Sequence, residues 1–226
     1  MEHLAIPIIA LVVIGMAMFS IASSVYEMVG KMSVLPEVQR RDDLPSEIIA
    51  ALPRDVAAFL ESKGFRFAGG YGFHTLRIGI WEQPSQSAPR RLFSFSLSGL
   101  GWTSEFITKF SDNDSLTTTR TRAAFMFPRP FGSFLQSFPK ASIEQLWDHH
   151  ERGEQHLISA LSIPLKECRL SFVEGFPIGI QRQMSCIKSY PLWPIRGIYW
   201  FLLKRFLMLN RPIWTQNVRR LYKKVN

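Results

Sequence analysis

The spacing of hydrophobic and polar positions changes several times along the chain, and each change predicts a different element. The first stretch, residues 4–26, contains no charged side chain between His3 and Glu27. At about 1.5 Å per residue, a helix of this length crosses the roughly 30 Å hydrocarbon core of a bilayer. The run is too long for a signal-peptide core and lacks a basic n-region. We therefore expect a single transmembrane helix over residues 1–28, with a cleaved signal peptide as the alternative.

Beyond a polar linker over residues 29–44, the pattern predicts a globular domain over residues 45–188. Apolar residues first recur at helical spacing from Ser46 to Gly64, where Pro53 predicts a kink or two short helices. From Phe65 the period falls to two, which is typical of strands in an antiparallel sheet with one solvated face. A capping-box pattern at Ser142 then opens a second helix.

The predicted fold class is therefore α+β, with four parts in sequence order. A single transmembrane helix is followed by an antiparallel sheet of about five strands, flanked by two helices. A basic amphipathic interfacial helix completes the chain, in a membrane-surface segment over residues 189–226. A phenylalanine-rich crossover over residues 125–138 is expected to pack on the sheet edge, or alternatively to line a small-ligand pocket.

The charge is distributed unevenly and predicts an orientation. The chain has a formal net charge of +9, yet no acidic residue follows Glu174. Lys31, Arg40 and Arg41 lie downstream of the predicted span, so the positive-inside rule favours a cytoplasmic body. We accordingly expect an inner-membrane protein with its N-terminus outside and its C-terminus in the cytoplasm.

The C-terminal basic region combines aromatic, aliphatic and cationic residues between Tyr190 and Trp214. On a helix, its apolar residues fall on one stripe, and its cations fall opposite or at the borders. This favours an in-plane helix on an anionic lipid surface; an ordinary basic helix packed on the domain is the alternative. The expected membrane-surface residues are Trp193, Arg196, Tyr199, Trp200, Lys204, Arg205, Arg211 and Trp214.

The second half of the first apolar stretch is rich in small residues, which allow a neighbouring helix to approach closely. Residues spaced for such packing are Gly15, Ala17, Ser20, Ala22 and Ser24. This pattern predicts contact with a partner helix from another subunit.

The sequence offers few candidate residues for catalysis or metal binding. The second domain helix carries the densest reactive set, which includes His149, His150, Glu154 and His156. The HExxH spacing of zinc enzymes is absent, as are a nucleophile elbow, a P-loop and a dinucleotide fingerprint. A solvated polar helix face is the favoured interpretation, and we assign no catalytic residue, metal or cofactor.

These features favour a protein that works by contact. The predicted function is a membrane-anchored accessory, structural or assembly subunit of a larger membrane protein complex. Its expected partners are the membrane, spanned and contacted at its surface, anionic lipids and other membrane protein subunits; nucleic acid is not expected. The alternative is a membrane-bound enzyme that uses His149, His150, Glu154 and His156 on an interfacial substrate.

Overall fold

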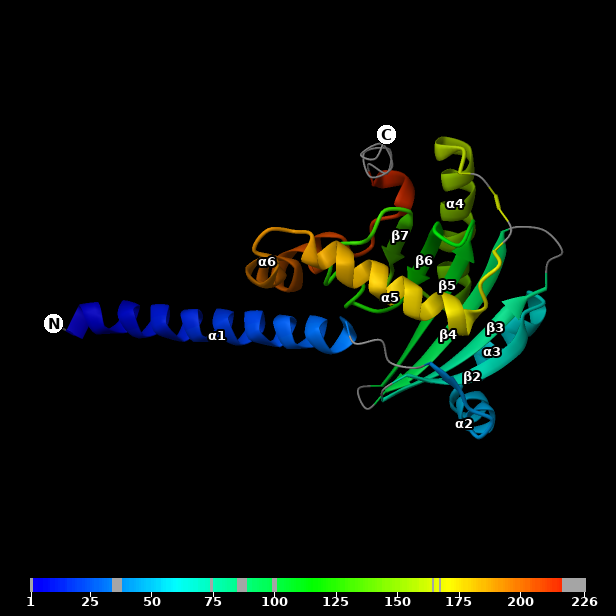
Figure 1. Cartoon of the computed structure of the whole chain (residues 1–226), viewed down its shortest axis with the longest axis horizontal. Helices are drawn as coiled ribbons and strands as arrows, with labels where there is room; N and C mark the ends of the chain where they lie inside the picture. The colour runs from blue at the N-terminus through cyan, green and yellow to red at the C-terminus, as the bar shows by residue number, and fades with distance from the viewer. Residues whose placement is uncertain are drawn as a thin grey trace.

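The computed structural model describes most of the chain. It covers residues 2–33, 38–73, 75–84, 89–98, 101–163, 165–166 and 168–216, without the side chains of residues 2–14, 28, 32, 33 and 161. The fold is of the predicted α+β class, and it is built around one seven-stranded sheet with helices on both faces (Figure 1).

The sheet is mixed, and its strands follow one another in sequence order. Each neighbouring pair is antiparallel except the last, β6 with β7, which is parallel. The strands are β1 (Gln39–Arg40), β2 (Arg66–Phe73), β3 (Leu76–Gln83), β4 (Arg90–Ser98), β5 (Gly101–Lys109), β6 (Ser115–Thr119) and β7 (Ser133–Ser137).

The predicted antiparallel sheet of about five strands is therefore wrong in its size and in its last pairing. Strand β1 has two residues, too few to show a period, and it lies in the predicted linker. Strand β7 lies in the phenylalanine-rich crossover, which returns the chain so that Phe134 pairs with Leu116 in parallel register. A parallel neighbour needs a crossover connection of this kind. Because the whole crossover is rich in apolar residues, its sequence pattern did not reveal strand β7 within it.

Three helices cover one face of the sheet: α2 (Leu44–Ala51), α3 (Arg54–Ser62) and α4 (Ile143–Leu161). Phe93, Phe95 and Phe106 of the central strands are fully buried beneath them. Pro53 separates α2 from α3, as its lack of an N–H group requires. The predicted capping box opens α4, because the Ser142 hydroxyl accepts from the Gln145 backbone N–H.

A helix that the periodicity did not predict, α5 (Phe172–Lys188), covers the opposite face. Its first half packs Phe172 and Phe176 on Tyr71 and Phe73. A second capping box, Ser171 with Glu174, opens this helix. In Figure 1, α5 runs diagonally across the sheet and continues past its edge towards α1.

The N-terminal stretch forms one long helix, α1 (Glu2–Ser33), but the predicted transmembrane anchor is wrong. Within the residues that the structure describes, no helix combines the length and the apolar character needed to cross a membrane. Serines lower the hydropathy of the second half of the predicted span. In addition, the side chains of Val25 and Val29 are buried against other parts of the chain. The localisation as a single-pass inner-membrane protein is wrong for the same reason.

The C-terminal region is also not one continuous amphipathic helix. It forms α6 (Trp193–Tyr199), the π-helix η1 (Trp200–Lys204) and α7 (Arg205–Leu207), followed by the short 3₁₀ helix η2 (Ile213–Thr215). We call α6, η1 and α7 the C-terminal helices. The chain then returns to the sheet, where the Asn210 backbone N–H donates to the Ser137 carbonyl at 2.8 Å. The last basic residues of the predicted membrane-surface segment, Arg219, Arg220, Lys223 and Lys224, lie outside the described residues.

Helix α2 can approach the sheet closely because Gly79 of β3 has no side chain. A Cβ atom at Gly79 would lie 2.5 Å from Ile48 Cγ2 and 2.7 Å from Trp81 Cζ3. Both neighbours are in the buried core, so neither has room to move away. We expect Gly79→Ala to lower the free energy of unfolding by about 1–3 kcal/mol, the usual range for overpacking.

Urea denaturation measures this effect, and Gly179→Ala on α5 is the matched control. A Cβ at Gly179 meets no atom within 4 Å, so alanine there should raise stability slightly through helix propensity. Equal effects of the two substitutions would contradict the close approach of α2 to the sheet.

Candidate functional site

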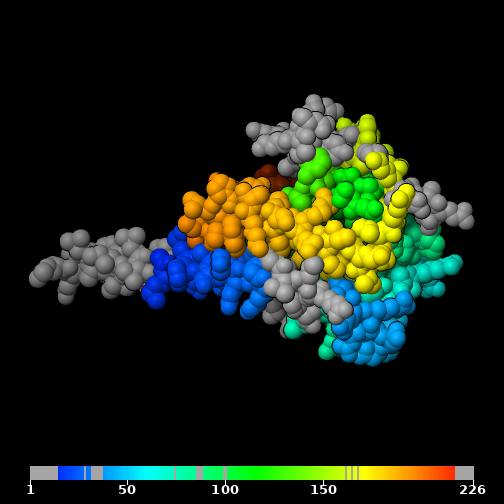
Figure 2. All heavy atoms as spheres, in the orientation of Figure 1, coloured from blue at the N-terminus to red at the C-terminus, as the bar shows by residue number. Residues whose placement is uncertain are grey.

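The C-terminal helices are apolar on two sides, and only one of these sides is covered within the chain. The covered side packs on α1: Gly197 is buried, and a Cβ there would lie 2.7 Å from Val25 Cγ1. Trp200 is 5% exposed, in one cluster with Val25 and Val29 of α1 and with Met184 and Ile187 of α5. Figure 2 shows the blue surface of α1 lying along the orange surface of α5 and α6.

The other side of the C-terminal helices faces outward, and we call it the outward face. Its side chains are large and apolar, at the spacing of one side of a helix. They are Ile195 (59% exposed), Tyr199 (50%), Leu202 (41%), Leu203 (56%), Phe206 (53%) and Leu207 (57%). Leu192, at the start of α6, is 70% exposed. Within the described chain nothing covers these side chains, and contiguous apolar surfaces of this kind are rarely left in water.

Cationic side chains accompany the outward face. The Arg205 guanidinium lies over the Phe201 and Phe206 rings, at 4.2 and 4.5 Å from their centroids. Arg196 lies 5.9 Å from the Tyr190 ring centroid. Lys204 is half-buried, and this burial lowers the pKa of its ammonium. Arg196 is exposed, and its long apolar stem lets it border such a surface while its charge stays near water.

The structure divides the predicted membrane-surface residues between several environments. Arg196, Tyr199 and Arg211 are exposed, whereas Lys204 and Arg205 are half-buried. The predicted surface tryptophans lie elsewhere. Trp193 stacks on Tyr26 of α1 at 5.6 Å, Trp200 is buried, and Trp214 of η2 lies against His149.

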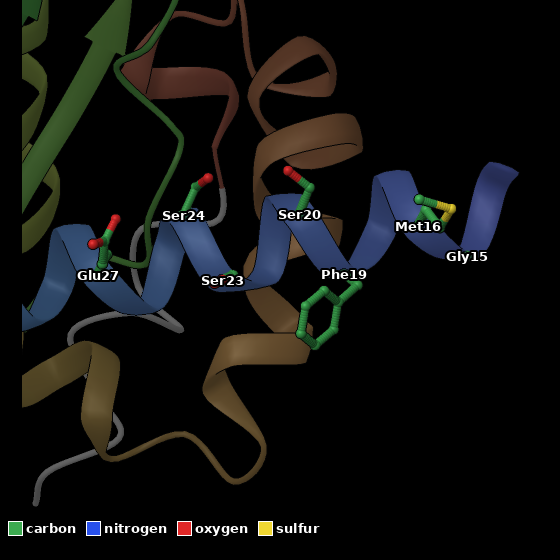
Figure 3. Close-up of a pocket in the computed structure, with 7 residues that line it drawn as sticks. All are labelled: Gly15, Met16, Phe19, Ser20, Ser23, Ser24 and Glu27. Atoms are coloured by element: carbon green, nitrogen blue, oxygen red, sulfur yellow. The ribbon is translucent and has the colours of Figure 1, made fainter.

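The small residues of α1 lie at a shallow, open hollow of about 540 Å³. Figure 3 shows its lining, all from α1: Gly15, Met16, Phe19, Ser20, Ser23, Ser24 and Glu27. Of the predicted packing residues, Gly15, Ala17, Ser20 and Ser24 are exposed and Ala22 is half-buried. The structure thus places four of the five on solvent-facing parts of the helix.

The reactive side chains of α4 belong to a buried hydrogen-bond network instead of an open site. His150 is fully buried between Thr108 Oγ1, 2.8 Å from its Nε2, and Thr118 Oγ1, 2.8 Å from its Nδ1. Thr108 donates to Glu154 Oε2 at 2.7 Å. Arg91 donates two hydrogen bonds to the same carboxylate, at 2.6 and 3.0 Å.

These bonds fix the tautomer of His150. The Thr108 hydroxyl gives its proton to Glu154, so it must accept the proton of His150 Nε2. Nδ1 is then the acceptor for Thr118, whose oxygen in turn accepts from the Gln136 amide at 2.8 Å. Both ring nitrogens are used, which is the state of a structural histidine rather than of an acid–base catalyst.

The electrostatics of the network agree with this assignment. Burial lowers the pKa of His150 from 6.5 to about 3, so the imidazole is neutral at physiological pH. Although burial opposes ionisation, hydrogen bonds from Arg91 and Thr108 hold the pKa of Glu154 below its usual value. The network therefore contains one ion pair and one neutral imidazole that joins α4 to β5 and β6.

The remaining candidates for chemistry do not converge on this network. His149 stacks on Phe138 at 3.8 Å, and His156 is half-buried further along α4. Among the described residues, no group of three or more His, Cys, Asp or Glu side chains is arranged to hold a metal ion. Cys168 and Cys186 are free thiols whose pKa values are raised by burial.

Comparison with known proteins adds no assignment. No family model, curated protein or solved structure matches the chain. The candidate site is accordingly defined by its own geometry: an exposed apolar face with cations at its border.

The buried histidine predicts how stability depends on pH. Between pH 6.5 and about 3 the unfolded chain binds a proton at His150 that the folded chain excludes. The free energy of unfolding should therefore fall as pH decreases below 6.5, by up to about 1.4 kcal/mol per pH unit from this group. Burial lowers the pKa of His149 too, which adds a contribution of the same sign.

His150→Gln should reduce this slope, because glutamine offers a donor and an acceptor but does not titrate. Urea denaturation from neutral pH down to about pH 5.5, one unit above the ordinary glutamate pKa of 4.5, measures it before Glu154 contributes much. His156→Gln, on the same helix, is the control. An unchanged slope in His150→Gln would contradict the neutral buried imidazole.

The packing of α1 on α6 is tested by a disulfide. An ideal Cβ at Gly197 lies 3.3 Å from Val25 Cβ, close to the 3.5–4.5 Å range of natural disulfides. With Cys168 and Cys186 replaced by serine, Val25→Cys/Gly197→Cys should form a bridge under mild oxidation. Thiol alkylation followed by mass analysis detects it.

The matched control pairs Val25→Cys with Gly179→Cys, because a Cβ at Gly179 has no atom within 4 Å. This pair should stay reduced. Free thiols in both pairs would refute the contact between α1 and α6.

Proposed function

We propose that the chain is an accessory or assembly subunit that works by contact, through the outward face of the C-terminal helices. The observation that carries this proposal is the exposure of a whole apolar side of these helices. Ile195, Leu203 and Phe206 each expose more than half of their surface. Monomeric proteins rarely leave such contiguous side chains in water unless they bind a partner.

The alternative of an enzyme built on α4 has weaker support. Its central members, His150 and Glu154, are buried and have their hydrogen-bonding positions occupied by neighbouring side chains. A general base must present a free atom to its substrate. Contact through the outward face is therefore the function that the geometry supports best.

The inward side of the same helices supports the proposal too. It is fixed to α1 by Val25 and Val29, and burial of a valine side chain contributes roughly 1.5–3 kcal/mol. The outward face is thus held on a packed helical unit. A surface held in place before binding loses less conformational entropy on association, which favours its use in recognition.

The test compares native particle size in cells that express the tagged full-length chain. After lysis without detergent, which would dissolve a lipid partner, the wild-type chain should travel in a large assembly. Leu203→Glu/Phe206→Glu should travel alone, because two buried carboxylates at a contact cost several kcal/mol.

Ile49→Glu is the matched control, since Ile49 is an equally exposed apolar residue (50%) on α2, far along the chain from the outward face. This variant should keep the wild-type particle size. A wild-type chain that travels alone, or a double variant that stays in the assembly, would refute the proposal.

A further inference from the structure

The charge around the outward face has one sign. The described residues from 175 to 216 contain no acidic side chain. The cations along this stretch are Arg182, Lys188, Arg196, Lys204, Arg205 and Arg211. None of the ion pairs that the structure shows among its described residues involves any of them. The segment that bears the outward face therefore carries positive charge only.

The cations and the apolar side chains of this face occupy the same short helices. Arg205 stacks on the half-buried Phe201 ring and on the exposed Phe206 ring. Arg196 lies further from its aromatic neighbour, 5.9 Å from the Tyr190 ring centroid. Cationic heads beside exposed Leu, Ile and Phe, with a tyrosine among them, are typical of helices that lie in the plane of an anionic lipid surface.

We infer that the partner of the outward face is an anionic lipid surface, contacted from one side by the C-terminal helices. Ile195, Leu203 and Phe206 enter the boundary between headgroups and acyl chains, and the arginines meet the lipid phosphates. This inference rests on the proposed function, because it names the partner of the same face. It requires no helix to cross the bilayer, since the helices lie along its surface.

Charge complementarity selects this partner over a second copy of the chain. A symmetric dimer through the outward face would place the positive charges of both copies, Arg196 and Arg205 among them, in one interface, and like charges across an interface are costly. An anionic leaflet instead supplies a dense negative surface for all of them. An acidic protein offers the same charge, and the experiment distinguishes the two.

The experiment uses the purified full-length chain and lipid vesicles. One set contains phosphatidylcholine alone, and in the other about a third of the lipid is phosphatidylglycerol. Sedimentation of the vesicles measures the bound fraction. The chain should bind the anionic vesicles, bind the neutral ones weakly, and lose affinity as salt concentration rises.

Two charge variants test the residues. Arg196→Gln/Arg205→Gln removes two cations of the C-terminal helices and should weaken binding to anionic vesicles roughly 25-fold, since each cation near such a surface contributes about fivefold. Arg54→Gln/Arg122→Gln removes two exposed cations from the sheet domain and should bind like the wild type. The apolar variant Leu203→Glu/Phe206→Glu should not bind.

Three results would overturn the inference. They are equal binding to both vesicle types, equal weakening by the two arginine pairs, and no binding to vesicles at all. If vesicles are not bound but Leu203→Glu/Phe206→Glu still leaves the assembly in cells, the partner is a protein and the proposed function stands. If neither vesicle binding nor entry into the assembly depends on the outward face, both proposals fail.

Discussion

Both faces of the central sheet are apolar, and the chain must cover both. Phe93 and Phe95 point to one side, towards α2, α3 and α4, while Ile78 and Ile80 point to the other. The only described helix packed on the second face is α5, whose first half lies over Tyr71 and Phe73. Its second half extends past the sheet and carries Met184 and Ile187 to α1 and α6. One helix thus joins the sheet to the unit that bears the outward face.

The polar network beneath α4 shows how the other side of the sheet is held in register. A fully buried imidazole is costly unless both nitrogens are satisfied, and here two threonines from adjacent strands satisfy them. Such a network is sensitive to a shift of α4 by one turn, because every donor and acceptor would lose its partner at once. His150 therefore contributes more to the specificity of the fold than to chemistry.

The sequence predicted those parts of the fold in which a local signal agrees with the final packing. The capping box at Ser142, the break at Pro53 and the strand period from Phe65 onward all have structural counterparts. Helix α5 escaped prediction because Gly175, Pro177 and Gly179 interrupt its apolar spacing, although Ser171 and Glu174 form a second capping box. That capping box was the signal that would have found it.

The transmembrane expectation failed for a different reason. Periodicity and the absence of charge describe how apolar a stretch is, but not what covers it. In the structure, Val25 of the predicted span and Val29, just after it, meet Gly197 and Trp200 of a segment far away in sequence. Pairing across such a distance leaves no local trace, so no window of residues reveals it.

The same limit explains the division of the predicted surface residues. A helical wheel sorts the C-terminal helices into one apolar stripe and one basic side, whereas the structure needs apolar residues on two sides. Trp200 packs inward against α1. It begins the π-helix η1, whose wider turn adds a residue to the helical repeat, and both Leu202 and Leu203 within this π-helix face outward. The apolar residues of the inward side are explained by their packing on α1. The other side is apolar and is bordered by cations that form no ion pair within the part of the chain that the structure describes, so its composition agrees with the proposed contact.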